Sequence, residues 1–191
     1  VTIDRGNGAP SELPSVETLR AIAKRLEQEP GVASVGYATA LPGTIWEQMV
    51  YELQSAELQT FVDTQRRTDE LWSAGTRVGE NFFETVGIPL VAGRTFTAAE
   101  IRQNAPVAVV DETFVRTVLG GRSPLGVTLR ERAEDETRRP GPWLEIVGVV
   151  EDFSPKGGVR ALYQPLDLSG AAPLHLAIHT AAGNPADHVA R

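Results

Sequence analysis

Three histidines, His175, His179 and His188, lie late in the chain and are the first residues to test for metal chemistry. On a helix, His175 and His179 would share one face and could bind zinc together, because histidines four residues apart on a helix form such sites. The run from Leu174 to Thr180 instead alternates between large apolar side chains and a set that includes both histidines, which predicts a half-buried strand. On a strand, roughly 3.3 Å per residue separates the two histidines by about 13 Å, too far for one ion. We therefore expect no metal site and place both histidines on the more solvated face of the strand.

Ser123 lies in the run Gly121-Arg122-Ser123-Pro124-Leu125, which is similar to the turn that exposes a nucleophilic serine in hydrolases. That turn requires a glycine two residues after the serine, where this chain has Leu125, so we expect a turn that leads into a strand. The sequence contains no Gly-x-Gly-x-x-Gly and no Walker A pattern, so it has no recognisable nucleotide site. Since no nucleophile and base stand at a known catalytic spacing, a hydrolase is only a third hypothesis. We expect no catalytic residue and no cofactor.

The carboxylates Asp111 and Glu112, and the cluster from Glu131 to Glu136, could form an acid and base pair or a site for a hard cation. Asp111 precedes an apolar stripe with helical spacing, so it is better explained as the N-cap of a helix. Arginines are interleaved with the cluster and continue after it, which weakens a dense cage of negative charge and favours a solvated hairpin tip. Only a perturbed pKa in a cleft would return these groups to a catalytic role.

Three tryptophans are candidates for contact with a ligand or partner: Trp46, Trp72 and Trp143. Trp143 begins an apolar strand, so we expect it in the core. Trp46 lies in a loop bounded by proline and glycine, and exposed loop aromatics are typical anchors of protein interfaces. Trp46 is therefore the candidate partner contact.

The elements that must position these side chains are short and separated by glycine and proline. Apolar runs predict strands at residues 1–4, 32–40, 49–53, 71–78, 105–110, 125–130, 143–150 and 174–180. Stripes with helical spacing predict helices at residues 13–26, 97–103 and 112–119. The polar stretch between 53 and 71 is not assigned. The first strand, helix and strand have the outline of a βαβ unit.

At 191 residues with 41% apolar content, the chain can bury a core, and it contains no cysteine. Its formal charge of -7 and pI near 5.0 disfavour binding to nucleic acid and to anionic lipid headgroups, since both attract clustered lysine and arginine. No run approaches the roughly 20 apolar residues that cross a bilayer, so we expect the chain as given to be soluble. It starts at Val1 without a methionine, and a helix that opens at Asn184 is cut short at Arg191, so we expect an excised segment.

The stretch from Arg77 to Phe96 reads as a strand end, a short helix with an aromatic pair, a glycine stop, an apolar strand after a proline, and a glycine turn. This order resembles the signature of the periplasmic core domain of MacB-type ABC transporter permeases, in the MacB and FtsX-like permease group. Residues 106–114, 123–126 and 144–150 resemble segments of the same family and follow one another in the same order. Within the family, the sequence is most similar to the orphan permeases. The positions that carry the resemblance are expected to set turns and packing: Phe82, Gly87, Pro89, Gly93, Arg94, Pro106, Asp111, Pro124 and Gly126.

The resemblance implies an α+β fold in two parts. Residues 1–94 and 171–191 would form a porter-like βαβ subdomain, and residues 95–170 a smaller inserted α/β subdomain of the type called Sabre. The porter-like part of the family closes with a further helix and strand, so this chain is expected to be truncated at its C-terminus.

The resemblance also implies a mechanical role on the periplasmic face of the bacterial cytoplasmic membrane. In the full protein, membrane helices would anchor the domain and link it to an ATP-binding cassette subunit or domain, in a homodimer or pseudo-dimer. The domain would turn helix movement into export or into work on a periplasmic adaptor or substrate protein, which needs no catalytic group. The second hypothesis is a module that holds a lipid, peptide or lipoprotein in the cleft between the subdomains.

Overall fold

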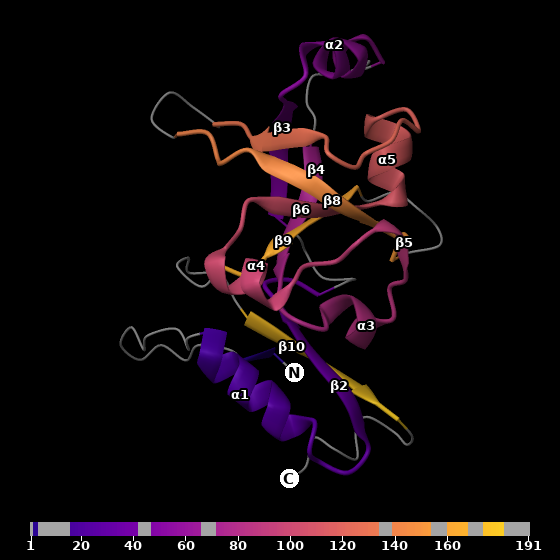
Figure 1. Cartoon of the computed structure of the whole chain (residues 1–191). Coiled ribbons are helices and arrows are strands. Elements are labelled where there is room, and N and C mark those ends of the chain that lie inside the picture. Colours follow the sequence, from indigo (N-terminus) through magenta and orange to yellow (C-terminus); the bar gives the residue numbers. More distant parts are fainter. Residues whose placement is uncertain are drawn as a thin grey trace.

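The computed structural model of the chain describes residues 2–3, 16–41, 47–65, 72–133, 139–153, 160–167 and 174–181. Its helices are α1 (Val16–Leu26), α2 (Ala56–Gln65), α3 (Phe82–Val86), α4 (Ala98–Gln103) and α5 (Glu112–Val118). Its strands are β1 (Thr2–Ile3), β2 (Val32–Ala38), β3 (Glu47–Leu53), β4 (Trp72–Val78), β5 (Leu90–Gly93), β6 (Val107–Asp111), β7 (Thr128–Glu131), β8 (Leu144–Val150), β9 (Ala161–Pro165) and β10 (Leu174–Thr180). These strands form one sheet with helices packed on it (Figure 1), which confirms the predicted α+β class.

The N-terminal βαβ unit is confirmed, with one strand inserted into it. β10 pairs antiparallel with β1 on one side and with β2 on the other, so β1 and β2 run parallel with α1 as their connection. Leu19 and Ala23, four residues apart, bring one face of α1 against Val35 and Tyr37 of β2. This layer forms the lower part of the molecule in Figure 1.

A closed ring of strands forms most of the remaining sheet. The paired order runs β4, β3, β7, β8, β6 and β9, and β9 pairs in turn with β4, which closes the ring. The pairs of β6 with β8 and of β4 with β9 are parallel, and the other four pairs are antiparallel. Closure satisfies the backbone groups on both sides of the ring strands where they pair.

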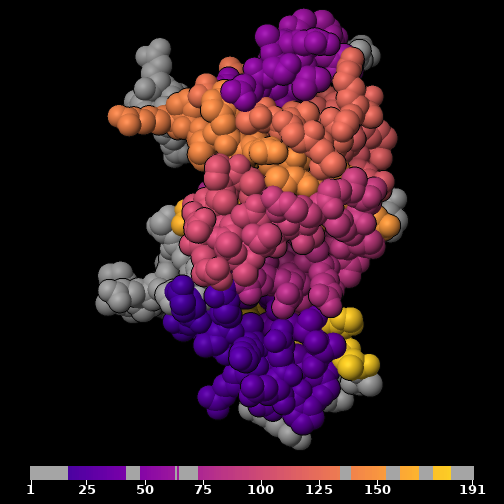
Figure 2. Space-filling view, in the orientation of Figure 1, coloured from indigo at the N-terminus to yellow at the C-terminus, as the bar shows by residue number. Residues whose placement is uncertain are grey.

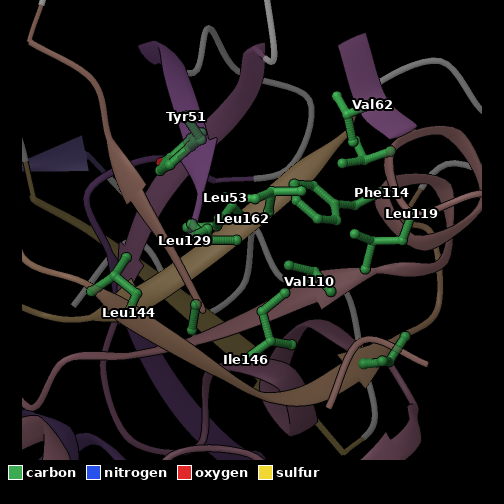
Figure 3. Close-up of a cluster of buried hydrophobic side chains, with 13 residues drawn as sticks. Tyr51, Leu53, Val62, Val110, Phe114, Leu119, Leu129, Leu144, Ile146 and Leu162 are labelled. Carbon is green, nitrogen blue, oxygen red and sulfur yellow. The ribbon is translucent and has the colours of Figure 1, made fainter. Parts of the chain in front are cut away.

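Side chains of the ring strands alternate between an inner and an outer cluster. Val110 and Ile146 belong to the inner cluster, where side chains from several strands point toward one another (Figure 3), while Val109 belongs to the outer cluster beneath α3. The pairing of β6 with β8 skips Val147, and this irregular step lets Ile146 and Val149 both join the inner cluster. Helices α5 and α2 add further apolar side chains to it.

Three features differ from the sequence prediction. α2 occupies the polar stretch that was not assigned, where Leu58, Phe61 and Val62 have helical spacing. β9 was not predicted at all. β7 begins at Thr128 instead of residue 125, because Gly126 takes a φ of 81° in the turn that precedes the strand.

The predicted division into residues 1–94 plus 171–191 and residues 95–170 stays a prediction. β3 and β4, from the first predicted part, pair with β7 and β9 from the second. The ring meets the β1–β10–β2 layer where Ala38 of β2 pairs with Val78 of β4. Trp46, His188 and the helix expected from Asn184 lie outside the described residues.

Candidate docking groove

The signature segment folds as predicted, with a five-residue helix between two left-handed residues. Asn81 has a φ of 59° before α3, and Gly87 has a φ of 70° after it. The backbone N–H of Gly87 donates to the carbonyl of Glu84, and that of Ile88 donates to the carbonyl of Phe83 at 2.8 Å. The predicted glycine stop is therefore confirmed, because glycine carries no Cβ to oppose this conformation.

An aromatic cluster fixes α3 on the ring. Phe82 and Phe83 are both buried, with their ring centroids 5.6 Å apart in an edge-to-face arrangement. Phe83 also meets Tyr163 of β9 edge-to-face at 4.9 Å and contacts Phe96 at 6.3 Å. Phe83 before β5, Phe96 after β5 and Tyr163 in β9 thus pack against one another in one cluster.

β5 is held against β8 by two glycines that allow close backbone approach. A Cβ added to Gly93 would lie 2.3 Å from the carbonyl oxygen of Val147, and one added to Gly148 would lie 2.0 Å from that of Arg94. Pro89 and Pro106 lie just before β5 and β6. The backbone N–H of Glu151 donates to the carbonyl of Pro89, and that of Glu145 donates to the carbonyl of Pro106, both at 3.0 Å.

Arg94 joins the end of β5 to α4. Its guanidinium donates two hydrogen bonds of 2.8 Å to the carboxylate of Glu100. Glu100 also completes a capping box with Thr97 at the start of α4. The Arg94 hydrogen bonds, with help from Thr97, lower the pKa of Glu100 to about 2.

A groove of about 460 Å³ opens beside α3, between the start of β5 and the start of α4. Its lining includes Phe83, Ile88, Leu90 and Phe96 together with the carboxylates of Glu80 and Glu84, and no lysine or arginine is among the described residues that line it. Residues 79–98 belong to the magenta surface across the middle of Figure 2. A smaller hollow of about 280 Å³ shares Glu80 and Asn81 with the groove and extends it toward α1.

The junction between the ring and the β1–β10–β2 layer borders this groove. The Thr76 hydroxyl lies 3.1 Å from both the backbone N–H and the carbonyl of Ala40, and the Thr39 hydroxyl accepts from the N–H of Arg77 at 3.0 Å. A Cβ added to Gly79 would lie 1.8 Å from the ring of Tyr37. β2 and β4 are therefore tightly packed where the two parts meet.

An ion pair across the junction adds to this packing, because the Arg20 side chain of α1 donates to Glu80, which precedes α3. A second ion pair lies within the ring, where Arg77 of β4 is 3.5 Å from the carboxylate of Asp167, which follows β9.

Asp111 is the helix cap that its position predicts. Its carboxylate accepts from the N–H of Phe114 at 2.7 Å, at the start of α5. Asp152 caps the same helix from after β8, accepting from the N–H and the hydroxyl of Thr113 at 2.7 Å. Asp111 is only 2% exposed, and burial raises its pKa to about 7.

The structure places the other candidate residues one by one on different elements. His175 and His179 lie on strand β10, as predicted, half-buried and exposed respectively. Ser123 precedes the buried Pro124 in a turn, also as predicted. Trp143 is half-buried instead of in the core, because it precedes β8, and the Arg130 guanidinium covers its ring at 4.4 Å. Trp72 belongs to β4.

Two features are absent from the part of the chain that the structure describes. No three histidine, aspartate or glutamate side chains there come together in a way that could hold a metal ion. No helix within those same ranges has the length and apolar content to span a bilayer.

The sequence prediction named the aromatic pair and the turns of this region but gave no role to Glu84, Leu90 and Val91. Leu90 and Val91 are 46% and 47% exposed, although they lie in an apolar strand. The sequence held one signal of this exposure, which is that two large apolar residues are adjacent. Adjacent residues of a strand point to opposite faces, so one of the two lies on each face.

Comparison with known proteins gives one family. The family model described as MacB-like periplasmic core domain matches residues 5–189. The chain is 33% identical over 75 residues to the macrolide export ATP-binding/permease protein MacB of Mannheimia succiniciproducens, covering 39% of this chain and 10% of the relative. It is 36% identical over 102 residues to MacB 2 of Aeromonas hydrophila, covering 52% of this chain and 14% of the relative. The chain thus spans only a small part of these relatives.

Two solved structures share the fold. The periplasmic region of MacB from Actinobacillus actinomycetemcomitans has a TM-score of 0.58 at 18% identity, covering 88% of this chain and 68% of that one. The extracellular domain of the noncanonic ABC-type transporter YknZ from Gram-positive bacteria has a TM-score of 0.55 at 17% identity, covering 90% and 82%. At these identities the likeness shows the fold alone.

Proposed function

Because the chain belongs to the MacB-like periplasmic core domain family, we propose that it acts as a rigid lever in an ABC transporter permease. In this proposal, membrane helices anchor the domain at the periplasmic face of the bacterial cytoplasmic membrane and link it to an ATP-binding cassette subunit or domain. Two copies, or two related domains, face each other. Movement of the helices passes through the domain to export or to a periplasmic partner.

The observation that carries this proposal is the position of the first and last described strands. β1 and β10 pair with each other, so both belong to the β1–β10–β2 layer. Force applied to that layer from either side reaches the ring through the junction with β4. A layer that receives the force, joined through a short junction to a ring that carries the groove, is what a lever requires.

The junction supports the proposal because it is stiff. Thr76 binds the backbone of Ala40, and the Arg20–Glu80 pair crosses the same boundary. Each exposed ion pair contributes little to stability, about 1 kcal/mol or less, but several contacts together restrict tilting of one part against the other.

The test is to loosen the junction in the full-length permease together with its ATP-binding component. A Thr76→Ala and Glu80→Ala variant should keep ATP hydrolysis while export per ATP falls at least about fivefold, as expected for loss of about 1 kcal/mol of coupling. A macrolide is the first substrate to assay, because the matched relatives are named for macrolide export. Arg130→Ala is the matched control, because it removes an ion pair with Glu52 that lies within the ring. Unchanged export in the double variant would refute the lever.

A ligand-binding module remains the second candidate, and the groove of about 460 Å³ favours it. Its volume is within the range of small-ligand pockets, and Phe83 and Phe96 supply apolar lining. Calorimetric titration with a lipopeptide should then show binding that Phe96→Asp abolishes. Titrations without heat would remove this candidate.

A further inference from the structure

β5 has one paired edge and one open edge. It pairs with β8, and among the described residues no strand pairs with its other side (Figure 1). Natural edge strands are commonly protected from further pairing by a charged side chain or a proline within the strand. β5 reads Leu-Val-Ala-Gly and has neither, so its edge is blunted only by its four-residue length and by an irregular step in its pairing between Leu90 and Ala92. Its side chains Leu90 and Val91 are about half exposed.

The groove continues from this edge, because Leu90 also lines it. Leu125, which is itself exposed, lies close to Gly93 at the other end of β5 and extends the apolar strip. The open edge therefore lies within an apolar surface that includes a hollow large enough for a side chain.

Carboxylates border the groove beside β5. Glu84 is exposed and has no ion pair among the described residues, whereas Glu80 is held by Arg20 and the exposed Arg94 after β5 is held by Glu100. Glu151, exposed as well, follows β8 and donates its N–H to the carbonyl of Pro89. The described lining of the groove has no lysine or arginine, and these residues line only the hollow that extends it toward α1, so an occupant that brings positive charge to Glu84 is favoured.

We propose that β5 and its groove receive an extended segment of another protein, with alternating apolar and basic residues, which adds to the open edge as a further strand. Backbone hydrogen bonds supply affinity in this mode of recognition, and alternate side chains supply specificity. Apolar side chains on one face of the segment cover Leu90 and Phe96, and a lysine or arginine beyond the residues paired with β5 faces Glu84. A second copy of the chain is disfavoured because its formal charge of -7 repels the same surface.

The strand offers only four residues for pairing, so the complex is weak and transient. This suits a partner that must be released in each cycle. The inference rests on the proposed function only for the identity of the partner, as a protein on which the lever acts. Because peptide binding is measured without ATP or export, failure of strand addition at β5 can be distinguished from failure of the lever.

The probe is a fluorescent peptide of about ten residues that alternates lysine and valine, titrated with the full chain and followed by anisotropy. One control peptide carries glutamate in place of lysine. A second keeps the side chains but has N-methylated central residues, which cannot pair through the backbone. The lysine peptide should bind and should protect the amides of β5 from hydrogen exchange, its affinity should fall in high salt, and both controls should bind at least about tenfold more weakly.

Surface variants locate the site. Leu90→Asn with Val91→Asn should weaken binding at least about tenfold, and Glu84→Lys about fivefold. Ile178→Asn and Glu57→Lys change similarly exposed residues on β10 and α2 and should alter affinity less than about twofold.

Four results would overturn the proposal. The first three are equal binding of the glutamate or N-methylated peptide, unchanged affinity in the β5 and Glu84 variants, and no binding of the lysine peptide at millimolar chain. Self-association of the chain that the Leu90→Asn and Val91→Asn changes abolish would make a second copy the occupant, which also overturns it.

Discussion

Replacing Asp111 with asparagine should remove a pH dependence of folding stability that burial of this carboxyl creates. Asp111 caps α5 through the N–H of Phe114 at 2.7 Å and is 2% exposed. Burial is the main cause that raises its pKa from 3.8 to about 7, and the nearby charge of Asp152 adds to the rise. Hydrogen bonds and the charge of Arg116 oppose it. Asparagine keeps a capping oxygen but cannot ionise.

The sign follows from the direction of the shift. Because the folded-state pKa is raised, the folded chain holds a proton that the unfolded chain has lost between about pH 4 and pH 7. The contribution of Asp111 to stability is therefore complete below about pH 4 and is lost as pH rises to about 7. At 1.36 kcal/mol per pH unit, the loss has an upper bound of roughly 4 kcal/mol.

Urea unfolding of the chain and of Asp111→Asn between about pH 4.5 and pH 7.5 measures this effect. The free energy of unfolding of the wild type should fall relative to that of the variant by roughly 3 kcal/mol across the window, and the variant should be at least as stable at the upper end. Glu112→Gln is the matched control, because Glu112 is an exposed carboxylate at the same helix start. Parallel pH profiles for wild type and Asp111→Asn would refute the assigned burial cost.

Two further substitutions test the structure around the groove. Gly148→Ala should destabilise the chain by about 2 kcal/mol or more in thermal unfolding, because the new Cβ would lie 2.0 Å from the carbonyl of Arg94; a wild-type melting temperature would contradict the close approach of β5 to β8. Arg94→Ala should raise the pKa of Glu100 from about 2 toward its usual value, which NMR titration of the Glu100 carboxyl measures; an unmoved titration would show that the Thr97 contacts alone set it.

Features set by nearby residues could be predicted from the sequence. The Asp111 cap depends on a backbone group three residues away, and the Gly87 stop depends on the φ preference of glycine. The two histidines of β10 followed from strand alternation. Nearby residues also predicted the positions of most strands and helices and the βαβ unit at the start of the chain.

Features set by distant partners could not be predicted. β9 is only five residues long, and it becomes a strand because β4 pairs with it from more than eighty residues earlier, at Ala74 with Ala161. The second cap of α5 comes from Asp152, 39 residues after Thr113. The raised pKa of Asp111 likewise depends on burial that only the closed ring creates.

The groove was predictable in part. Phe82 and Phe83 were placed on a short helix, and that helix forms one wall. Exposure of Leu90 and Val91 could not be foreseen, because an apolar strand normally indicates burial and the open edge of β5 depends on how the ring closes.

The most direct test of the lever is a pair of distance measurements by electron spin resonance in the full-length permease. The chain has no cysteine of its own, so Ala33→Cys on β2 and Glu57→Cys on α2, both at exposed positions, can carry spin labels once any cysteines elsewhere are replaced. We predict that the distance between these labels within one domain stays the same with and without ATP, while the distance between Glu57→Cys labels on two copies changes. A domain that bends between the two labels as ATP binds, or copies that do not move apart or together, would contradict the account.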